Sequence, residues 1–144
     1  MIDFKKQEEN IINYVTENYG FFLDNFNIKP PKITAEFLDF DKYKNDFVCY
    51  IEFDNSAFSD RFNDDCTKTE TLYINVYLAH RNNTPEKLNS LMLNSTSAFY
   101  NMIHIKEMKN IIKQTVNKAD FFKYIEGANN IFCGKLSIEL IIEL

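Results

Sequence analysis

The sequence predicts a single α+β domain, in which a mainly antiparallel sheet carries an N-terminal helix and one long central helix packed on one face. Segments that alternate apolar and polar residues, as half-buried antiparallel strands do, occur at 47–53, 69–80 and 132–144. Apolar residues at helical spacing occur near the N-terminus and again after residue 85. The 144 residues contain no repeat and no Ser/Gly linker, so we expect one domain spanning residues 1–144.

The first expected element is a helix from Phe4 to Tyr19. Asp3 can cap its N-terminus, and Gly20 stands where a left-handed residue would end it. One face of this helix is apolar: Ile11, Ile12, Val15 and Tyr19. After Pro30-Pro31, which ends any preceding helix, we expect a strand from Ile33 to Phe40.

Two clearer strands follow, Phe47–Phe53 and Thr69–His80. Their alternation predicts an antiparallel pair joined by a long polar loop, Asp54–Lys68. The central helix then begins at Thr84-Pro85-Glu86, a good N-cap followed by a proline suited to the first helical position. Its apolar stripe is Leu88, Leu91, Met92, Ser95, Phe99, Met102 and Ile103.

The region 104–126 is compatible with either a continued helix or a strand. The chain then closes on Phe132–Leu144, whose apolar positions alternate with polar ones almost to the last residue. Because these strands alternate instead of being apolar throughout, a doubly wound parallel sheet is disfavoured.

Few residues suit catalysis or metal binding. The chain has two histidines, His80 and His104, and three cysteines without CxxC spacing, an odd number that predicts free thiols. Cys49 shares a face with apolar residues, and the acidic neighbours of Cys66 would raise its thiol pKa and weaken it as a nucleophile. Residues 60–65 are similar in composition to a calcium-binding loop, but the sequence lacks the glycine and glutamate that such a loop needs. We therefore expect that this chain is not an enzyme and that it binds neither a metal nor a cofactor.

Charge is distributed unevenly along the chain, whose net charge is −5. Residues 36–70 hold ten acids and four bases, whereas residues 104–123 hold five lysines and two acids. Such segments can pair between copies of a protein, although both can also be solvated faces that maintain solubility. The candidate self- or partner-interface residues are Asp54, Phe58, Asp60, Phe62, Asp64, Asp65, Lys106, Lys109 and Lys113.

Aromatic residues within the 54–68 loop suit docking to a partner, and packing back onto the domain's own core is the alternative. The N-terminus is polar and no run is apolar enough to cross a bilayer, so we expect synthesis and folding in a cytoplasm without membrane insertion.

The layout of the whole chain resembles the tail terminator, or tail-completion, proteins of tailed bacteriophages and phage-like particles. The resemblance rests on the N-terminal helix, the strand after the prolines, the antiparallel pair with its long excursion, the Thr84-Pro85-Glu86 helix and the aromatic segment 120–127 before the last strand. It carries over no individual functional residue. It implies a structural virion protein at the tail–neck junction, assembled in the host bacterial cytoplasm.

Such proteins form a ring, usually hexameric, on the head-proximal end of the tail tube. The resemblance therefore implies contacts with copies of the same chain, with the tail tube protein and with a neck or head-completion protein. DNA would pass through the lumen without specific binding. Two alternatives remain open: another head–tail connector or neck component, and a cytoplasmic immunity-type module that binds one protein.

Overall fold

The computed structural model describes residues 3–36, 40, 44–62, 68–82 and 85–143, without the side chains of residues 55–62 and 68. The elements in chain order are α1 (Phe4–Asp24), β1 (Lys32–Thr34), β2 (Phe47–Phe62), β3 (Lys68–Asn82), α2 (Pro85–Ile105), β4 (Ile111–Glu126) and β5 (Asn129–Glu143). The strands form one sheet in the order β1-β2-β3-β5-β4. All neighbouring strands are antiparallel except the short β1, which is parallel to β2. The predicted α+β class is confirmed.

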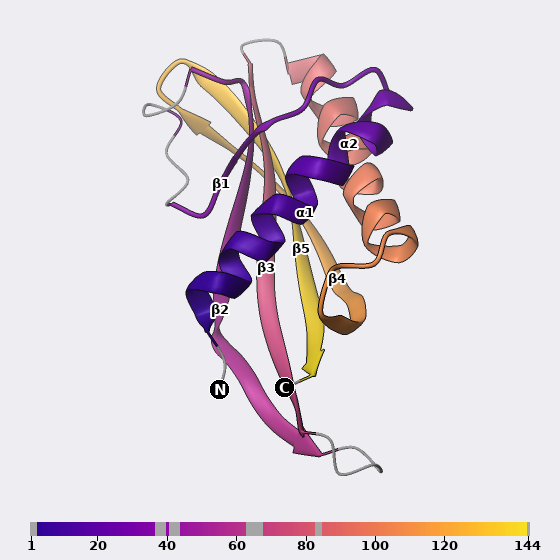
Figure 1. The fold of residues 1–144 in the computed structure, drawn as a ribbon. Coiled ribbons are helices and arrows are strands. Elements are labelled where there is room, and N and C mark those ends of the chain that lie inside the picture. Colours follow the sequence, from indigo (N-terminus) through magenta and orange to yellow (C-terminus); the bar gives the residue numbers. More distant parts are fainter. Residues whose placement is uncertain (1–2, 37–39, 41–43, 63–67, 83–84, 144) are drawn as a thin grey trace.

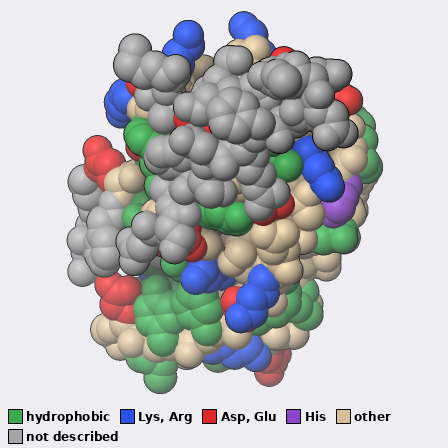
Figure 2. All heavy atoms as spheres, turned by 90° about the horizontal axis from the view of Figure 1, so that it is seen from below, with side chains coloured by type: hydrophobic (Ala, Val, Ile, Leu, Met, Phe, Trp, Pro, Cys, Tyr) green, Lys and Arg blue, Asp and Glu red, His purple; other side chains and the backbone are tan. Residues whose placement is uncertain are grey.

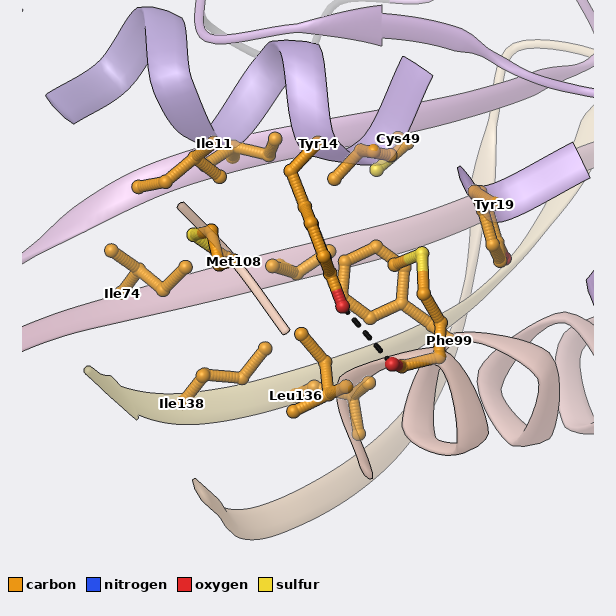
Figure 3. Packing of buried hydrophobic residues seen from close by; sticks show 14 of the residues in the cluster. Ile11, Tyr14, Tyr19, Cys49, Ile74, Phe99, Met108, Leu136 and Ile138 are labelled. Carbon is orange, nitrogen blue, oxygen red and sulfur yellow. Dashed lines mark hydrogen bonds between the residues drawn. The ribbon is translucent and has the colours of Figure 1, made fainter. Parts of the chain in front are cut away.

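Both helices cover the same face of this sheet. In Figure 1, α1 crosses diagonally in front of β2 and β3, and α2 lies beside it toward β5 and β4. The main core fills the space between the helices and the sheet, and Figure 3 shows side chains from both helices and three strands meeting there. Tyr19 stacks edge-on against Phe99 of α2, with ring centroids 5.1 Å apart.

The N-terminal helix is longer than predicted. Asp3 caps it as expected, since its carboxylate accepts a hydrogen bond from the backbone N–H of Lys6 at 3.1 Å. Gly20, however, lies inside the helix, which runs on to Asp24. A mid-helix glycine costs about 1 kcal/mol. Burying Phe22 and Leu23 in the next turn contributes about 1.5–3 kcal/mol each, which outweighs that cost.

The strand predicted at Ile33–Phe40 is wrong in its extent, because β1 ends at Thr34. The Thr34 hydroxyl accepts a hydrogen bond from the backbone N–H of Glu36 at 3.0 Å, a local turn that competes with strand pairing. Phe40 is buried against the opposite face of the sheet with Val48, Ala79 and other residues. The Arg81 guanidinium lies 4.9 Å from the centre of its ring.

The predicted loop Asp54–Lys68 is also wrong for most of its length. Strand β2 continues through Asp54 to Phe62 and pairs with β3 beyond a register shift between Phe53 and Phe58. Figure 1 shows the tip of this β2–β3 hairpin extending beyond the end of β5, although β3 stays paired with β5 as far as Thr69. The β3 side of this hairpin is not solvated as a loop would be, because Thr69, Glu70 and Thr71 are buried and pair with Glu143, Ile142 and Ile141 of β5.

The remaining elements follow the sequence closely. Helix α2 begins at Pro85, and its predicted stripe is buried except for the half-buried Leu91. Strand β5 carries the predicted alternation. The region left open between helix and strand is resolved as strand β4, which begins after the left-handed Asn110 and turns into β5 at Gly127, whose φ is +60°.

Candidate functional site

The acidic half of the predicted interface lies on one strand. Asp54, Phe58, Asp60 and Phe62 are all in β2, and Asp64 and Asp65 lie outside the described residues. The Asp54 carboxylate accepts a hydrogen bond from the side-chain amide of Asn75 on β3 at 3.3 Å. These residues therefore belong to a paired strand and not to a loop.

The basic half lies on and beside β4. Lys113 is in β4, and Lys106 and Lys109 lie in the connection that leads into it from α2. All three side chains are exposed, and no described carboxylate lies within 4 Å of their ammonium groups. The backbone at these lysines is well held, because the Lys109 carbonyl accepts a hydrogen bond from the Asn10 side chain at 2.9 Å. The connection thus presents its lysines from a fixed backbone.

The strand order keeps the two halves apart. Because β3 and β5 lie between β2 and β4, the acidic strand and the basic strand lie toward opposite edges of the sheet. The fold therefore does not bring the predicted acidic and basic residues together within one chain. Seen from the end where the hairpin projects, the described charged side chains are scattered among hydrophobic ones and form no single field (Figure 2).

The sheet face opposite the helices carries an aromatic row that the sequence analysis missed. Tyr50 and Tyr77 stack with centroids 5.5 Å apart, and Phe122 meets Tyr77 edge-on at 6.5 Å and stacks with Tyr124 at 6.2 Å. The row therefore spans β2, β3 and β4. The alternating aromatic residues of 120–127 were its sequence signal, but only the strand order aligns them with Tyr77.

A carboxylate anchors one end of this row. Glu52 accepts hydrogen bonds from the hydroxyls of Tyr50 and Tyr77 and from the Asn75 amide, at 3.1–3.3 Å. Burial, followed by the hydrogen bond to Glu52, raises the pKa of Tyr77 to about 12. The Tyr77 hydroxyl thus stays protonated and donates to the carboxylate at neutral pH, which fixes the ring.

The structure also pairs a serine with a histidine. His80 Nε2 lies 2.8 Å from Ser95 Oγ, and the Phe47 ring stacks on the imidazole at 4.0 Å. Both side chains are buried, and burial lowers the pKa of His80 to about 3. A substrate cannot reach a serine with no exposed surface, so this pair ties β3 to α2 and is not arranged as a nucleophile and base.

The described cysteines, Cys49 and Cys133, are free and buried, as the sequence predicted for Cys49. Burial raises the pKa of both thiols, that of Cys133 to about 12. Cys66 lies outside the described residues. Among the described residues, no group of three or more His, Cys, Asp or Glu side chains could hold a metal ion, and no helix is long and apolar enough to span a membrane.

The fold alone defines the class of protein, a two-layer α+β domain. Its surface carries an aromatic row on the sheet face opposite the helices, and acidic and basic residues toward opposite edges of the sheet. No protein-family model matches the chain, and no curated protein shows significant similarity to it.

Proposed function

We propose that this chain is a structural virion protein of the tail terminator type, which forms a ring on the head-proximal end of a phage tail tube and joins it to the neck. The observation that carries the proposal is the placement of acidic β2 and basic β4 on opposite sides of one sheet. Two complementary surfaces on opposite sides of a rigid domain are what head-to-tail association requires, and such association closes into a ring when the rotation allows.

The lysines support this proposal because they have no described partner within their own chain. Lys106, Lys109 and Lys113 are free to meet carboxylates of a neighbouring copy. The tip of the β2–β3 hairpin, at one end of the sheet, supplies a second surface that suits contact with the tail tube protein. The neck or head-completion protein would then bind the other end of the ring.

The overall charge is consistent with a DNA conduit. Proteins that grip DNA neutralise its phosphates with clustered Lys and Arg, and this chain has a net charge of −5. A ring of such subunits would let DNA pass through its lumen without specific binding. The six-fold stoichiometry rests on the resemblance to tail terminators.

Charge reversal at the three lysines tests the proposal. Replacing Lys106, Lys109 and Lys113 with glutamate is expected to shift self-association, measured by light scattering, to a concentration at least about tenfold higher, since each tenfold corresponds to only about 1.4 kcal/mol. The matched control reverses Lys6, Lys29 and Lys87, which are also exposed and lie outside β2, β4 and the connection into β4. The control changes the net charge equally and is expected to leave assembly as it was.

Equal effects of the two triple variants would show that only total charge matters. A chain that stays monomeric and binds one soluble protein tightly would contradict the ring and favour an immunity-type module. Assembly into a ring that binds neck proteins but not the tail tube would favour another connector of the head–tail junction.

A further inference from the structure

Strand β4 forms an edge of the sheet. It pairs with β5 on one side, and no described strand pairs with its other side. Register shifts interrupt its first half, the second of them between Val116 and Lys118, but its pairing with β5 is regular from Lys118 to Glu126. This stretch contains neither proline nor glycine. It therefore keeps the regular backbone that a further strand needs.

The same stretch exposes apolar side chains on both faces of the sheet. Phe121 and Ile125, on the side of the helices, are 47% and 75% exposed. Phe122 and Tyr124, on the opposite face, are each 38% exposed. A neighbour that continues the sheet would cover both faces at once, whereas a partner resting on one face would leave the other in water.

The lysine in the middle of the stretch does not cover the open edge. Edge strands in water are normally protected by charged side chains, above all by lysines. The ammonium group of Lys123, however, lies 4.7 Å from the centre of the Phe132 ring in β5. This side chain therefore lies back over its own sheet.

The two ends of the stretch carry opposite charges. Lys118 stands at one end and Glu126 at the other, and the stretch as a whole has two bases, two acids and no net charge. When two copies lie antiparallel and centred on Phe122, Lys118 of each copy lies directly opposite Glu126 of the other. Opposite charges at such positions stabilise a strand pair, and here the pair occurs twice. The stretch is thereby complementary to itself.

The neighbouring registers lack this complementarity. Directly opposite residues of an antiparallel pair lie on the same face, so one copy slides past the other in steps of two residues. A step in one direction centres the pair on Lys123, which then lies opposite its own copy, and places Asp120 opposite Glu126. A step in the other direction centres the pair on Phe121 and leaves every charged residue of the stretch opposite an uncharged one.

On the helix side, the register centred on Phe122 places a large side chain opposite a small one. Ile125 of each copy lies opposite Ala119 of the other. A hollow of about 290 Å³ lies beside Ala119, between β4 and α2, and its lining includes Thr96 and Tyr100. The most exposed apolar side chain of the stretch thus meets a position with free space, and the two-fold symmetry makes this contact twice.

On the opposite face, the same register joins two aromatic rows. Within one chain the row runs from Tyr50 through Tyr77 to Phe122 at the edge of the sheet. Centring the pair on Phe122 places this ring directly opposite its own copy, with Cβ atoms about 5 Å apart. Aromatic pairs at such positions stabilise antiparallel strands. The row would then continue from one subunit into the next.

We propose that residues 118–126 of β4 pair antiparallel with the same residues of a second copy, about a two-fold axis at Phe122, and so join two sheets into one. Such a contact is isologous and closes as a dimer. It goes beyond the proposed ring and does not rest on it, because Lys106, Lys109 and Lys113 lie outside the paired stretch. Both contacts lie at the β4 side of the sheet, so the dimer is the form of the chain outside the ring.

Cysteine cross-linking tests the register. Phe122→Cys places two thiols at the two-fold axis, where Cα atoms lie within the about 4.4–6.8 Å that a disulfide spans. Tyr124→Cys is the matched control, because it is equally exposed on the same face but would lie about 13 Å from its copy. Both changes are made in a chain with Cys66→Ser, since Cys49 and Cys133 are buried. Electrophoresis without reductant is expected to show at least about tenfold more covalent dimer for Phe122→Cys than for the control.

Charge exchange tests the pairing of the two ends. Lys118→Glu places two carboxylates opposite each other twice and is expected to raise the dimer dissociation constant about tenfold in sedimentation equilibrium. Adding Glu126→Lys restores opposite charges and is expected to recover most of the affinity, with a main species at twice the 17.0 kDa chain mass. These measurements are made with Lys106, Lys109 and Lys113 also changed to glutamate, which prevents the proposed ring.

Each outcome separates the dimer from the ring. Equal cross-linking of the two cysteine variants, or no recovery in the Lys118→Glu/Glu126→Lys chain, would overturn this register. A chain that is monomeric at every concentration once the ring lysines are reversed would overturn the dimer and leave the ring standing. Strong cross-linking of Phe122→Cys in a chain that never forms a ring would support the dimer and contradict the proposed function alone.

Discussion

The side-chain amide of Gln114 donates a hydrogen bond to the backbone carbonyl of Ile103 at 2.7 Å. Ile103 lies in the last turn of α2, whose carbonyls have no partner within the helix. The same amide group donates to the Lys106 carbonyl, and its oxygen accepts the backbone N–H of Met108 at 3.0 Å. One side chain of β4 therefore ends α2 and orders the connection that bears the candidate lysines.

Tyr14 joins this arrangement from α1. Its hydroxyl points at the carbonyls of Met102 and Lys106, 3.0 and 2.7 Å away, and Figure 3 shows the first of these contacts crossing the core. Burial raises the pKa of Tyr14 to about 12, so the hydroxyl remains a donor at neutral pH. Both helices and β4 thus meet at the point from which the lysines project.

Replacing Gln114 tests this tie. Gln114→Leu removes the donor to the carbonyls of Ile103 in α2 and Lys106 in the connection, and is expected to lower the free energy of unfolding by about 1–3 kcal/mol. The measurement is urea denaturation followed by circular dichroism. Gln114→Glu keeps the size but replaces donors with a carboxylate, so it is expected to be at least as destabilising. If Gln114→Glu were harmless, side-chain volume and not hydrogen bonding would explain the site.

Gly134 is predicted to tolerate no side chain. A Cβ atom there would lie 2.0 Å from Thr96 Oγ1, so Gly134→Ala forces β5 and α2 apart and is expected to cost about 1–3 kcal/mol of unfolding free energy. Thr96→Ala removes that oxygen and is expected to rescue much of the loss in the double variant. Strict additivity of the two changes in denaturation would refute the close contact as the cause.

Buried His80 predicts a pH dependence of stability. Its pKa falls to about 3 in the folded chain, below the ordinary 6.5, so the unfolded chain binds the proton first. The stabilisation is present above pH 6.5 and is lost as the pH falls toward 3, by up to about 1.4 kcal/mol per pH unit. Measurement between pH 7 and 5 avoids most carboxylate titration.

In that window, His80→Gln is expected to flatten the dependence of unfolding free energy on pH, although the variant is less stable at pH 7. His104→Gln, at an exposed site, is the control for loss of an imidazole. An unchanged slope in His80→Gln would mean that another group causes the acid sensitivity.

The elements that the sequence predicted well are those with one buried face. The stripe of α2 and the alternation of β5 reflect close packing against the core, so their periods can be read directly. Strand β4 has no such signal, because as an edge strand it is mostly exposed on both faces, and its identity depends on its pairing with β5. The end of α1 was predicted too early because glycine locally favours the end of a helix, as Gly20 was expected to do. Burial of Phe22 and Leu23, which the local sequence does not show, extends the helix instead.

The sequence predicted which charged residues make up the candidate site, but not where they lie in the fold. Charge counts separated an acidic segment from a basic one, yet their positions on opposite sides of the sheet depend on β5 inserting between β3 and β4. No local pattern encodes that insertion. The aromatic row from Tyr50 to Tyr124 was missed for the same reason, since its members are distant in sequence and meet only across paired strands.

Head-to-tail assembly of this chain into a closed ring can be measured by native mass spectrometry of the purified chain over a range of concentrations. We expect one dominant closed assembly, at six times the 17.0 kDa chain mass if the stoichiometry follows the tail terminators. This assembly is expected to dissociate when the charges of Lys106, Lys109 and Lys113 are reversed. A monomer at all concentrations, alone and with tail tube protein, would contradict it.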